Sequence, residues 1–492
     1  MRPITSYIQK YLLATLPFAL VFISSLYHPY DPDLGWHLKY GEYFFDNFAV
    51  LRENTFSSQM PSYEWANHSW GTDVIAYATY INFGFLGLAI LSATVITLTF
   101  FFFAKAAQLN YFEKALIFPL LIYLLSPINS VSLRSQLLSL LAMGILIYIL
   151  SRLPKHIFWL VGLFLIWANI HGQFILGVAV FFFFIVFLVI GQLIDKGLGQ
   201  IKEILKEYRY LLIIFCLAIL ATLVNPFGTN IWQETLRHFA NPLQKYIQEW
   251  LPPGEMSFTW WNHLIVGLIL FFGSLFIIFG NQLTQKRISL GIVSIFFIMS
   301  FMAKRYGWTM YYLSIPIMAP AAAFLAPDSK KYSTILGTII LLFSLGLLFF
   351  LDNPLARIKN MGWESYCQKY MYCSGKAVEF LIDKNYKGEL LTLYNWGGYI
   401  IWNYPQVKPT IDGRMTLWRD ETGYSAFENY YALEQNFEDI DRSVYDVVLT
   451  SKEKPIYFRL LSLAQNNKWQ LAYNDNFAAV FVRKDTAIRV RP

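Results

Sequence analysis

The chain has 492 residues, of which 56% are hydrophobic and only 14% are charged. Soluble domains carry roughly a quarter charged residues, so this composition excludes a water-soluble globular protein and indicates one embedded in a lipid bilayer. The formal net charge of +7 comes from basic residues scattered among short loops. No basic stripe or nucleic-acid-binding motif accompanies this charge, so the sequence predicts no nucleic-acid partner.

Apolar segments of roughly twenty residues, the length that crosses a hydrocarbon core, recur through the first 351 residues. No small-residue cleavage site follows the first of them, which predicts an uncleaved anchor. Prolines such as Pro119, Pro316 and Pro320 interrupt two segments and predict kinks rather than helix ends. The pattern predicts an α-helical polytopic membrane protein with about eleven transmembrane helices, over residues 10–27, 85–106, 112–127, 134–152, 155–172, 174–194, 208–225, 262–280, 287–303, 308–326 and 333–351.

Lysine and arginine residues divide unequally between the two sides of these spans. Fourteen lie in loops on the side of the N-terminus, and seven lie in the opposite loops that precede the tail. Because cytoplasmic loops carry the excess of basic residues, the N-terminus is predicted to be cytoplasmic. An odd number of spans then places the tail outside. The chain is thus expected in the cell (plasma or inner) membrane.

The sequence therefore predicts a transmembrane domain of residues 1–351, with an outer loop at 28–72, and a soluble extracytoplasmic α/β domain of residues 352–492. In the tail, residues 375–383 predict a helix. GELLTLYNW, VKPTIDGRM and YDVVLTSK predict strands, and WQLAYNDNFAAVFVRK predicts a hairpin turning at Asn474-Asp475. Cys367 and Cys373 lie close enough for a small disulfide loop outside the cytoplasm, or they are two unrelated thiols.

The first outer loop carries the residues best suited to chemistry. Asp31 before Pro32 is typical of a helix N-cap followed by proline at the first helical position. Capping would occupy Asp31 and leave Asp33 for another task. Asp33 and His37 are four residues apart and share a face of the predicted helix. Trp36 suits the membrane interface. The loop therefore offers a carboxylate and an imidazole just above the bilayer, or simply a solvated ion pair.

The same loop ends in Trp65-Ala66-Asn67-His68-Ser69-Trp70. Taken alone, this segment is more typical of an aromatic belt with His68 hydrogen-bonded at the interface. The loop's carboxylates and two imidazoles also match the oxygen and nitrogen ligands of a divalent metal. No HExxH or HxH spacing is present, so no metal-ligand residue is assigned, and a divalent metal is only one option for a cofactor.

Cations recur at the outer ends of the predicted spans, notably Arg134, Lys304 and Arg305. Such cations commonly reach towards lipid headgroups. They could alternatively bind a lipid-linked phosphate, for which arginine gives bidentate contacts. His171 adds a polar group near membrane depth, where such groups are costly unless buried or lining a cavity.

Two tail motifs follow predicted strands, namely Asn395-Trp396-Gly397-Gly398-Tyr399 and Ile411-Asp412-Gly413-Arg414. We interpret their glycines as turn residues. Asp412 and Arg414 either pair with each other or face the membrane site.

Taken together, DPDLGWHLKYGEYFFDN, TFSS and EWANHSW resemble the first outer loop of bacterial membrane proteins in the GT-C glycosyltransferase superfamily. The resemblance continues through SLRSQ, WANIHGQF and NPFG into NWGGYIIW and IDGRM, and so covers most of the chain. Gly35 stands where that pattern usually has an aromatic residue.

The resemblance implies transfer of a sugar from a polyprenyl-phosphate donor to an acceptor on the outer face. Asp33, or secondarily Asp31, would be the base that activates the acceptor hydroxyl, with His37 and His68 orienting it. The leaving phosphate would be bound by Arg134, Lys304 or Arg305. Further contacts to the substrate would come from His171, Asp412 and Arg414. Aromatic residues such as Trp36 and Trp70 would stack on sugar rings. Two alternative functions stay open. One is a transporter or flippase of lipid-linked saccharides, and the other is a non-catalytic scaffold for envelope assembly. The motifs do not specify the donor sugar, the acceptor or the oligomeric state.

Overall fold

The computed structural model describes residues 4–129, 133–240, 247–252, 261–262, 264–270, 272–273, 284–359, 361–385 and 388–484. The chain divides into two compact units. The helical unit comprises Met1–His28, Gly87–Leu236 and Gln244–Lys359, and the tail unit comprises Pro29–Leu86, Arg237–Leu243 and Asn360–Pro492. The first outer loop therefore groups with the tail in one unit, and the domain boundary expected after residue 351 stays a prediction.

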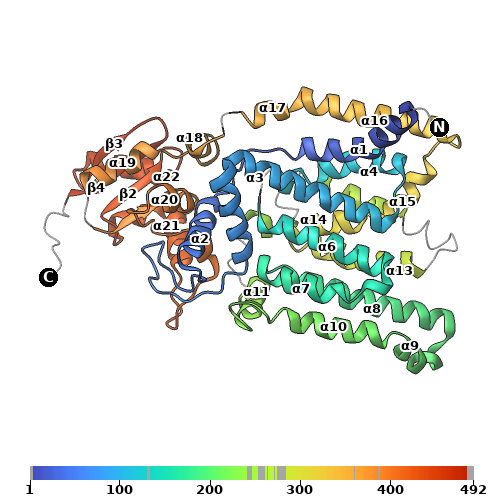
Figure 1. Cartoon of the computed structure of the whole chain (residues 1–492). Helices are drawn as coiled ribbons and strands as arrows, with labels where there is room; N and C mark the ends of the chain where they lie inside the picture. The colour runs from blue at the N-terminus through green and yellow to red at the C-terminus, as the bar shows by residue number, and fades with distance from the viewer. Residues whose placement is uncertain are drawn as a thin grey trace. The chain divides into compact units, whose positions relative to one another are not determined.

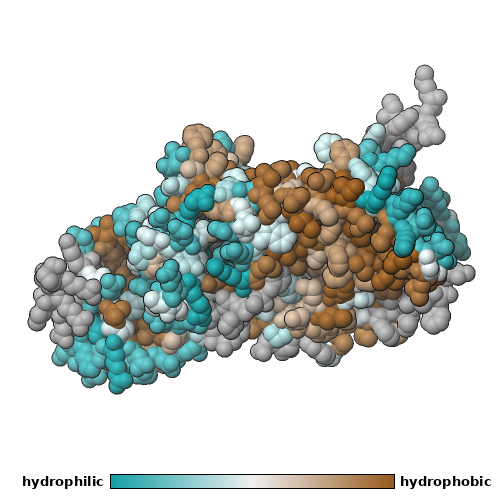
Figure 2. Space-filling model, turned by 90° about the horizontal axis from the view of Figure 1, so that it is seen from below, coloured by the Kyte–Doolittle hydropathy of each residue, from teal (hydrophilic) through white to brown (hydrophobic). Residues whose placement is uncertain are grey.

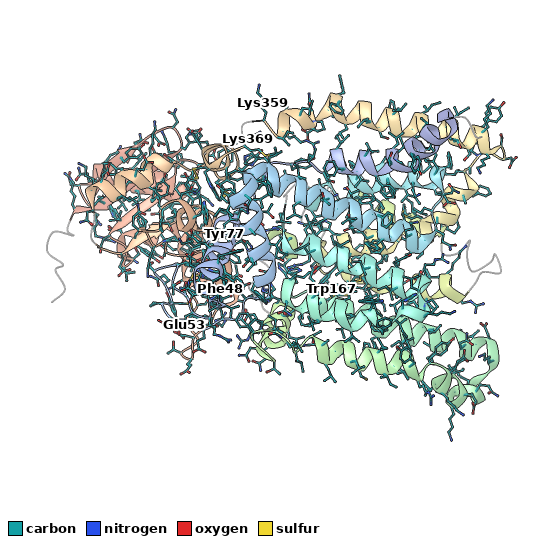
Figure 3. All side chains as sticks on the ribbon, in the orientation of Figure 1. Phe48, Glu53, Tyr77, Trp167, Lys359 and Lys369 are labelled. Carbon is teal, nitrogen blue, oxygen red and sulfur yellow. A yellow bond between two sulfur atoms is a disulfide. The ribbon has the colours of Figure 1, made fainter. Side chains whose placement is uncertain are left out.

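The helical unit is built almost entirely of α-helices (Figure 1). Trp167 lies among them, and hydrophobic residues gather over much of their surface on the face shown in Figure 2 (Figures 2 and 3). The main helices are α1 (Ile4–Ser24), α4 (Tyr111–Leu124), α5 (Ser126–Asn129), α6 (Ser135–Arg152), α7 (Trp159–Ile170), α8 (Phe174–Lys196), α9 (Ile201–Glu207), α10 (Arg209–Ala221), α13 (Thr284–Ser300), α14 (Lys304–Leu313), α15 (Ile315–Phe324), α16 (Lys330–Leu351) and α17 (Pro354–Arg357).

Among the residues that the structure describes, four helices are long and apolar enough to cross a membrane, namely α6, α8, α16 and α3 (Trp70–Ala107). Shorter apolar helices cover Leu13–Ser24, Trp159–Ile170, Arg209–Ala221 and Ile315–Phe324. Helix α3 is interrupted at Gly84, whose φ of 60° is not helical, and its part beyond this break coincides with the span predicted at 85–106. The total of eleven spans stays a prediction, and much of the one at 262–280 lies outside the described residues.

The prolines act differently in the two interrupted segments. Pro119 lies inside α4 without ending it, as predicted. The single span predicted over 308–326 is instead two helices, α14 and α15, which meet at Ser314. Pro316 is at the start of α15, where proline is tolerated because the first helical N–H groups have no partner within the helix.

The tail unit combines α2 (Leu34–Asn47) and residues 70–86 of α3 with a small α/β domain. Its sheet has the strand order β1-β2-β4-β3, with β1 parallel to β2 and the other pairs antiparallel. The strands are β1 (Leu390–Thr392), β2 (Val447–Ser451), β3 (Trp469–Asn474) and β4 (Ala478–Arg483), and the helices are α18 (Trp363–Ser365), α19 (Gly375–Lys384), α20 (Gly397–Asn403), α21 (Ala426–Gln435) and α22 (Pro455–Gln465).

The helix predicted at 375–383 and the C-terminal hairpin are confirmed. Strands β3 and β4 are joined at Asp475, whose carboxylate accepts hydrogen bonds from the N–H groups of Phe477 and Ala478 at 2.8 and 2.9 Å. An aspartate that binds nearby backbone N–H groups stabilises a tight turn, which explains why the hairpin could be located from sequence.

The strand predicted in VKPTIDGRM is wrong. Among the described residues this segment forms no strand and ends in a short 3₁₀ helix, Gly413–Leu417. Proline at 409 lacks an N–H group for a ladder. Thr410 instead pairs with β1 through hydroxyl groups: its Oγ1 accepts from Thr392 N–H at 2.9 Å, and its N–H donates to Thr392 Oγ1 at 3.0 Å. Side-chain hydrogen bonds therefore replace the expected backbone ladder.

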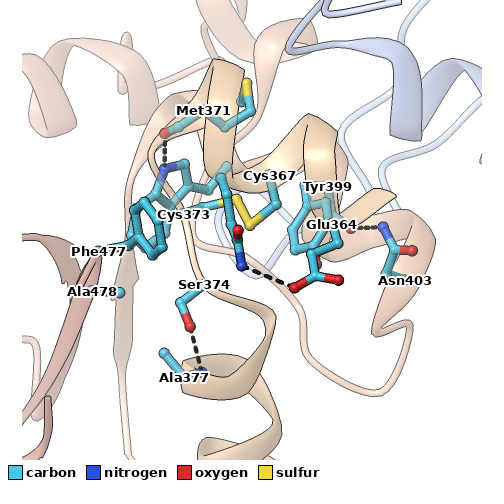
Figure 4. Close-up of a disulfide and its surroundings, with 12 residues drawn as sticks. Glu364, Cys367, Met371, Cys373, Ser374, Ala377, Tyr399, Asn403, Phe477 and Ala478 are labelled. Carbon is cyan, nitrogen blue, oxygen red and sulfur yellow. Dashed lines mark hydrogen bonds between the residues drawn. A yellow bond between two sulfur atoms is a disulfide. The ribbon is translucent and has the colours of Figure 1, made fainter. Parts of the chain in front are cut away.

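Cys367 and Cys373 form a disulfide (Figure 4). Of the two alternatives that the sequence left open, the small disulfide loop is therefore the one observed. The loop is also held by the Trp396 indole, which donates to the carbonyl of Met371 at 2.9 Å. Ser374 then caps α19 by accepting a hydrogen bond from the Ala377 N–H at 3.3 Å. The disulfide thus closes a short loop of the tail unit just before α19.

Candidate active site

The turn before α2 places the two aspartates of the first loop. The helix begins at Leu34 with Asp33 at the N-cap, so the prediction of Asp31 as N-cap and Pro32 as first helical residue is wrong. The Asp31 carboxylate accepts from the Asp33 N–H at 3.1 Å, and the Asp31 carbonyl accepts from the Tyr366 hydroxyl at 2.5 Å. Asp31 thus binds a local N–H group, as aspartates commonly do, but in the turn before the helix rather than at its N-cap. The Asp33 side chain makes no capping hydrogen bond.

His37 follows Asp33 by one helical turn, and its N–H donates to the Asp33 carbonyl at 3.2 Å. The imidazole Nδ1 lies 2.5 Å from Oδ1 of Asp73. Asp73 is completely buried, and its other carboxylate oxygen accepts a hydrogen bond from the Asn67 side chain at 2.6 Å. The His37 side chain keeps 20% of its surface exposed. The result is a carboxylate-bound imidazole with an accessible face.

The charges around His37 decide its protonation. Burial disfavours the imidazolium and by itself lowers the pKa of His37. The Asp73 carboxylate, helped by Asp31 and Asp33, outweighs burial and raises that pKa above its ordinary value. The carboxylates around His37 therefore favour its protonated, imidazolium form.

Asp73 and Asn67 were missed by the sequence analysis as members of this site. Asn67 lies in the WANHSW segment, and Asp73 lies three residues beyond it in the first turn of α3. An acidic residue in a first helical turn usually indicates only a favourable interaction with the helix dipole. The available signal was weak because the partner of Asp73 is on another helix.

The other aromatic and imidazole residues of the loop surround this pair or lie apart from it. Trp36 stacks on His37 with ring centroids 3.6 Å apart and is buried. Trp70 packs near Phe44 at 5.6 Å. His68 lies beside His238, 5.2 Å between ring centroids. Within the described ranges, no three His, Cys, Asp or Glu side chains gather in an arrangement that could hold a metal ion.

Asp412 and Arg414 pair with each other, one of the two arrangements left open by the sequence. The Arg414 guanidinium donates to both Asp412 oxygens at 2.8 and 2.7 Å, and both side chains are fully buried. Burial alone would raise the pKa of Asp412, but Arg414 and the Ser57 hydroxyl hold it below its usual range. The guanidinium also lies against the rings of Phe56, Trp65 and Trp418. This pair joins the loop to the tail.

In the helical unit, the structure brings two of the predicted cations together. Glu249 lies 3.2 Å from Arg134 and 3.4 Å from Arg305, so one carboxylate joins both guanidinium groups. Arg305 also packs over the Trp250 ring at 4.2 Å. Lys304 is buried and its backbone N–H donates to the Leu251 carbonyl at 3.1 Å.

His171 is a buried member of a hydrogen-bonded chain between helices. Its Nδ1 lies 2.8 Å from the Ser139 hydroxyl, which accepts from the Trp167 indole at 2.7 Å. Polar groups at membrane depth need such partners because lipid offers none. These contacts account for the burial of His171 among the helices.

No family profile and no curated protein sequence matches the chain. Solved structures do match. The oligosaccharyltransferase of Archaeoglobus fulgidus in its apo form is 11% identical with a TM-score of 0.54, and the match covers 91% of this chain and 70% of that one. Oligosaccharyltransferase AglB of the same organism, in complex with an inhibitory peptide and a dolichol-phosphate, is 10% identical with a TM-score of 0.53 over 99% and 76%.

ArnT from Cupriavidus metallidurans, bound to undecaprenyl phosphate, is 12% identical with a TM-score of 0.50 over 98% of this chain and 99% of that one. The oligosaccharyltransferases and ArnT are GT-C membrane glycosyltransferases. At 10–12% identity the matches establish a common fold. The chain is therefore an integral membrane protein with the GT-C fold, as its loop and tail motifs predicted.

Proposed function

We propose that this protein transfers a sugar from a polyprenyl-phosphate-linked donor to an acceptor in the envelope, at the outer face of the membrane. The observation that carries the proposal is the grouping of Asp33 with the His37–Asp73 pair on and beside α2, in a chain with the GT-C fold. A carboxylate and an imidazole near a hydroxyl acceptor are the residue types that general-base catalysis requires.

In the proposed step, the acceptor oxygen attacks the anomeric carbon while its proton passes to the Asp33 carboxylate. The bond between the anomeric carbon and the phosphate oxygen breaks, and its electron pair stays on the lipid phosphate. His37, held through Nδ1 by Asp73, presents Nε2 as a hydrogen-bonding partner for the acceptor hydroxyl. Asp33 is therefore the proposed base, and His37 orients the acceptor.

The departing phosphate requires positive charge. Arg134 and Arg305 suit this role because they already share one anionic group, the Glu249 carboxylate. Arginine binds phosphate oxygens through paired N–H groups. Lys304 is the neighbouring cation in the chain, although its burial makes it a weaker candidate than the two arginines.

A divalent cation is the alternative source of positive charge. Removal of metal with EDTA, followed by addition of Mg²⁺ or Mn²⁺, separates the two proposals. Transfer supported by the arginines alone continues in EDTA, whereas transfer that stops in EDTA and returns with metal assigns part of the charge to the cation.

The test compares cells that lack the gene with the same cells carrying the wild type or Asp33→Asn. Lipid and envelope fractions are analysed by mass spectrometry for glycosylated products. We expect a product that is restored by the wild type and not by Asp33→Asn, at equal amounts of membrane protein. An unchanged product in Asp33→Asn would contradict the proposal, and lipid-linked saccharide crossing the membrane in that variant would favour the transporter.

A further inference from the structure

Two glycine motifs of the tail lie directly against Pro32 and Asp33 of the first loop. A β-carbon added at Gly35 would lie 1.8 Å from the Gly398 carbonyl oxygen, and one added at Gly398 would lie 2.3 Å from the Pro32 carbonyl oxygen. Real β-carbons do not approach backbone atoms so closely. Helices α2 and α20 therefore meet backbone to backbone at their first turns. This contact fixes the position of the turn before α2 relative to α20.

Gly413 contacts the side chain of Asp33 itself. A β-carbon added at residue 413 would lie 1.8 Å from Oδ1 of Asp33, 2.5 Å from its Cγ and 2.7 Å from its Oδ2. The Asp33 carboxylate thus lies over the α-carbon of Gly413. The atoms in the way belong to a side chain that can rotate, so a methyl group here displaces the carboxylate without requiring the backbone to move.

The segment around Gly413 is held in place from both sides. Asp412 is bound by Arg414 and by the Ser57 hydroxyl of the first loop. Arg414 also donates to the Asn54 side chain at 3.0 Å. Three residues before Asp412, the Pro409 carbonyl accepts a hydrogen bond from the Ser58 N–H at 2.9 Å. Gly413 therefore presents a rigid surface to Asp33.

We propose that Gly413 is a positioning residue, which sets the location of the Asp33 carboxylate by providing space for it, and that the Asp412–Arg414 pair fixes Gly413 for this task. The inference rests on the proposed function in one respect, since it takes Asp33 as the base. It assigns the tail a direct part in the reaction, because the tail motif shapes the place where the base lies. Misplacement of a reacting group by about 1 Å can reduce a rate by up to roughly a hundredfold.

The first experiment tests the contact without using activity. Asp33→Cys and Gly413→Cys are combined in full-length protein carrying Cys216→Ser and oxidised in membranes, and the crosslink is detected by peptide mass spectrometry. Adjacent β-carbons are expected to give a disulfide. Asp33→Cys with Gly362→Cys is the control, because a β-carbon at residue 362 meets nothing within 4 Å. Absence of the first crosslink, or equal formation of both, would overturn the inference.

The second experiment tests the positioning role with Gly413→Ala and the matched control Gly362→Ala. In membranes that make the product identified above, Gly413→Ala is expected to lower the maximal rate roughly ten- to a hundredfold, with an unchanged KM for the lipid donor. The melting temperature should change little in both variants. Gly398→Ala, in contrast, should unfold the tail unit, because its added methyl group would collide with the backbone of Pro32.

The outcomes separate the two proposals. A crosslink together with wild-type rates in Gly413→Ala would leave the proposed function standing and overturn the positioning role. A crosslink in the double-cysteine protein, together with a wild-type protein that transfers no sugar, would overturn the proposed function, and with it Asp33 as base. A raised KM at unchanged maximal rate in Gly413→Ala would assign Gly413 to donor binding and overturn its effect on the base.

Discussion

Nδ1 of His37 lies 2.5 Å from Oδ1 of Asp73, although 36 positions separate the two residues in the sequence. A carboxylate that binds one ring nitrogen of a histidine orients the ring and favours the tautomer with the proton on that nitrogen. The other nitrogen is then the one that acts on a bound molecule. Asn67 fixes Asp73 in turn, since its side chain donates to the second carboxylate oxygen at 2.6 Å.

Asp73→Asn should lower the transfer rate about ten- to a hundredfold and move the acidic limb of the pH–rate profile to lower pH. The carboxylate raises the pKa of His37, so the imidazole becomes neutral only above that raised value. An amide carries no charge, so the pKa falls and the neutral form persists in more acidic solution. The measurement is the initial rate between pH 5 and 9, with the exposed Asp46→Asn as control. A lower rate with an unmoved limb would assign Asp73 a structural role only.

Arg414→Met should destabilise the tail unit by about 3–5 kcal/mol, because it leaves the buried Asp412 charge without its partner. Arg419→Met, which removes a half-exposed pair with Glu428 in the same segment, should cost less than about 1 kcal/mol. Hydrogen exchange of the β2 amides reports the stability of this unit. Equal effects of the two substitutions would contradict the buried pair.

The same pair gives the tail unit an acid limit. The pKa of Asp412 is lower in the folded protein than in the unfolded chain, whose aspartates titrate at about 3.9. The stabilisation is therefore fully present above that ordinary value and is lost as the pH falls through the lower, folded pKa. In Asp412→Asn/Arg414→Met, the decline in stability below pH 4 should be shallower than in the wild type.

Local patterns sufficed for the elements whose determinants are close in sequence. The hairpin was predicted because Asp475 binds the backbone two and three residues later. The Asp33–His37 spacing was recognised because one helical turn joins them. The loop and tail motifs, taken as a pattern, predicted the GT-C fold.

The N-cap of α2 was misplaced by two residues for a local reason, whereas the other misses share a physical cause, because each depends on a contact between distant segments. The predicted strand at 407–415 was lost to hydroxyl contacts between Thr410 and Thr392. The partnership of His37 with Asp73 crosses from α2 to α3. The glycines of the tail motifs satisfy a turn pattern, but Gly413 also makes room for the side chain of Asp33. Which residues from distant segments lie close together cannot be inferred from the spacing of residues in a single sequence.

Glu249→Gln should increase the affinity for undecaprenyl phosphate about fivefold, since the carboxylate neutralises the two arginines proposed to bind phosphate. Arg305→Ala should weaken binding. Native mass spectrometry of the protein in nanodiscs, titrated with the lipid, gives both values. Glu207→Gln, which removes an exposed pair with Lys196, is the matched control and should have no effect. Weaker binding in Glu249→Gln would show that the carboxylate organises the arginines and does not compete with the lipid.

The proposed topology predicts which engineered thiols a membrane-impermeant maleimide can reach in intact cells. Glu53→Cys, in the exposed part of the first loop, should be labelled from outside, and Gln200→Cys should react only after the membrane is opened. Cys216→Ser is the background for both. The Cys367–Cys373 disulfide supports this orientation, because disulfides persist in oxidising compartments. Cys367 and Cys373 should therefore resist alkylation until a reductant is added. Labelling of Gln200→Cys in intact cells, with reduced thiols at 367 and 373, would reverse the orientation and place the Asp33 site on the cytoplasmic side.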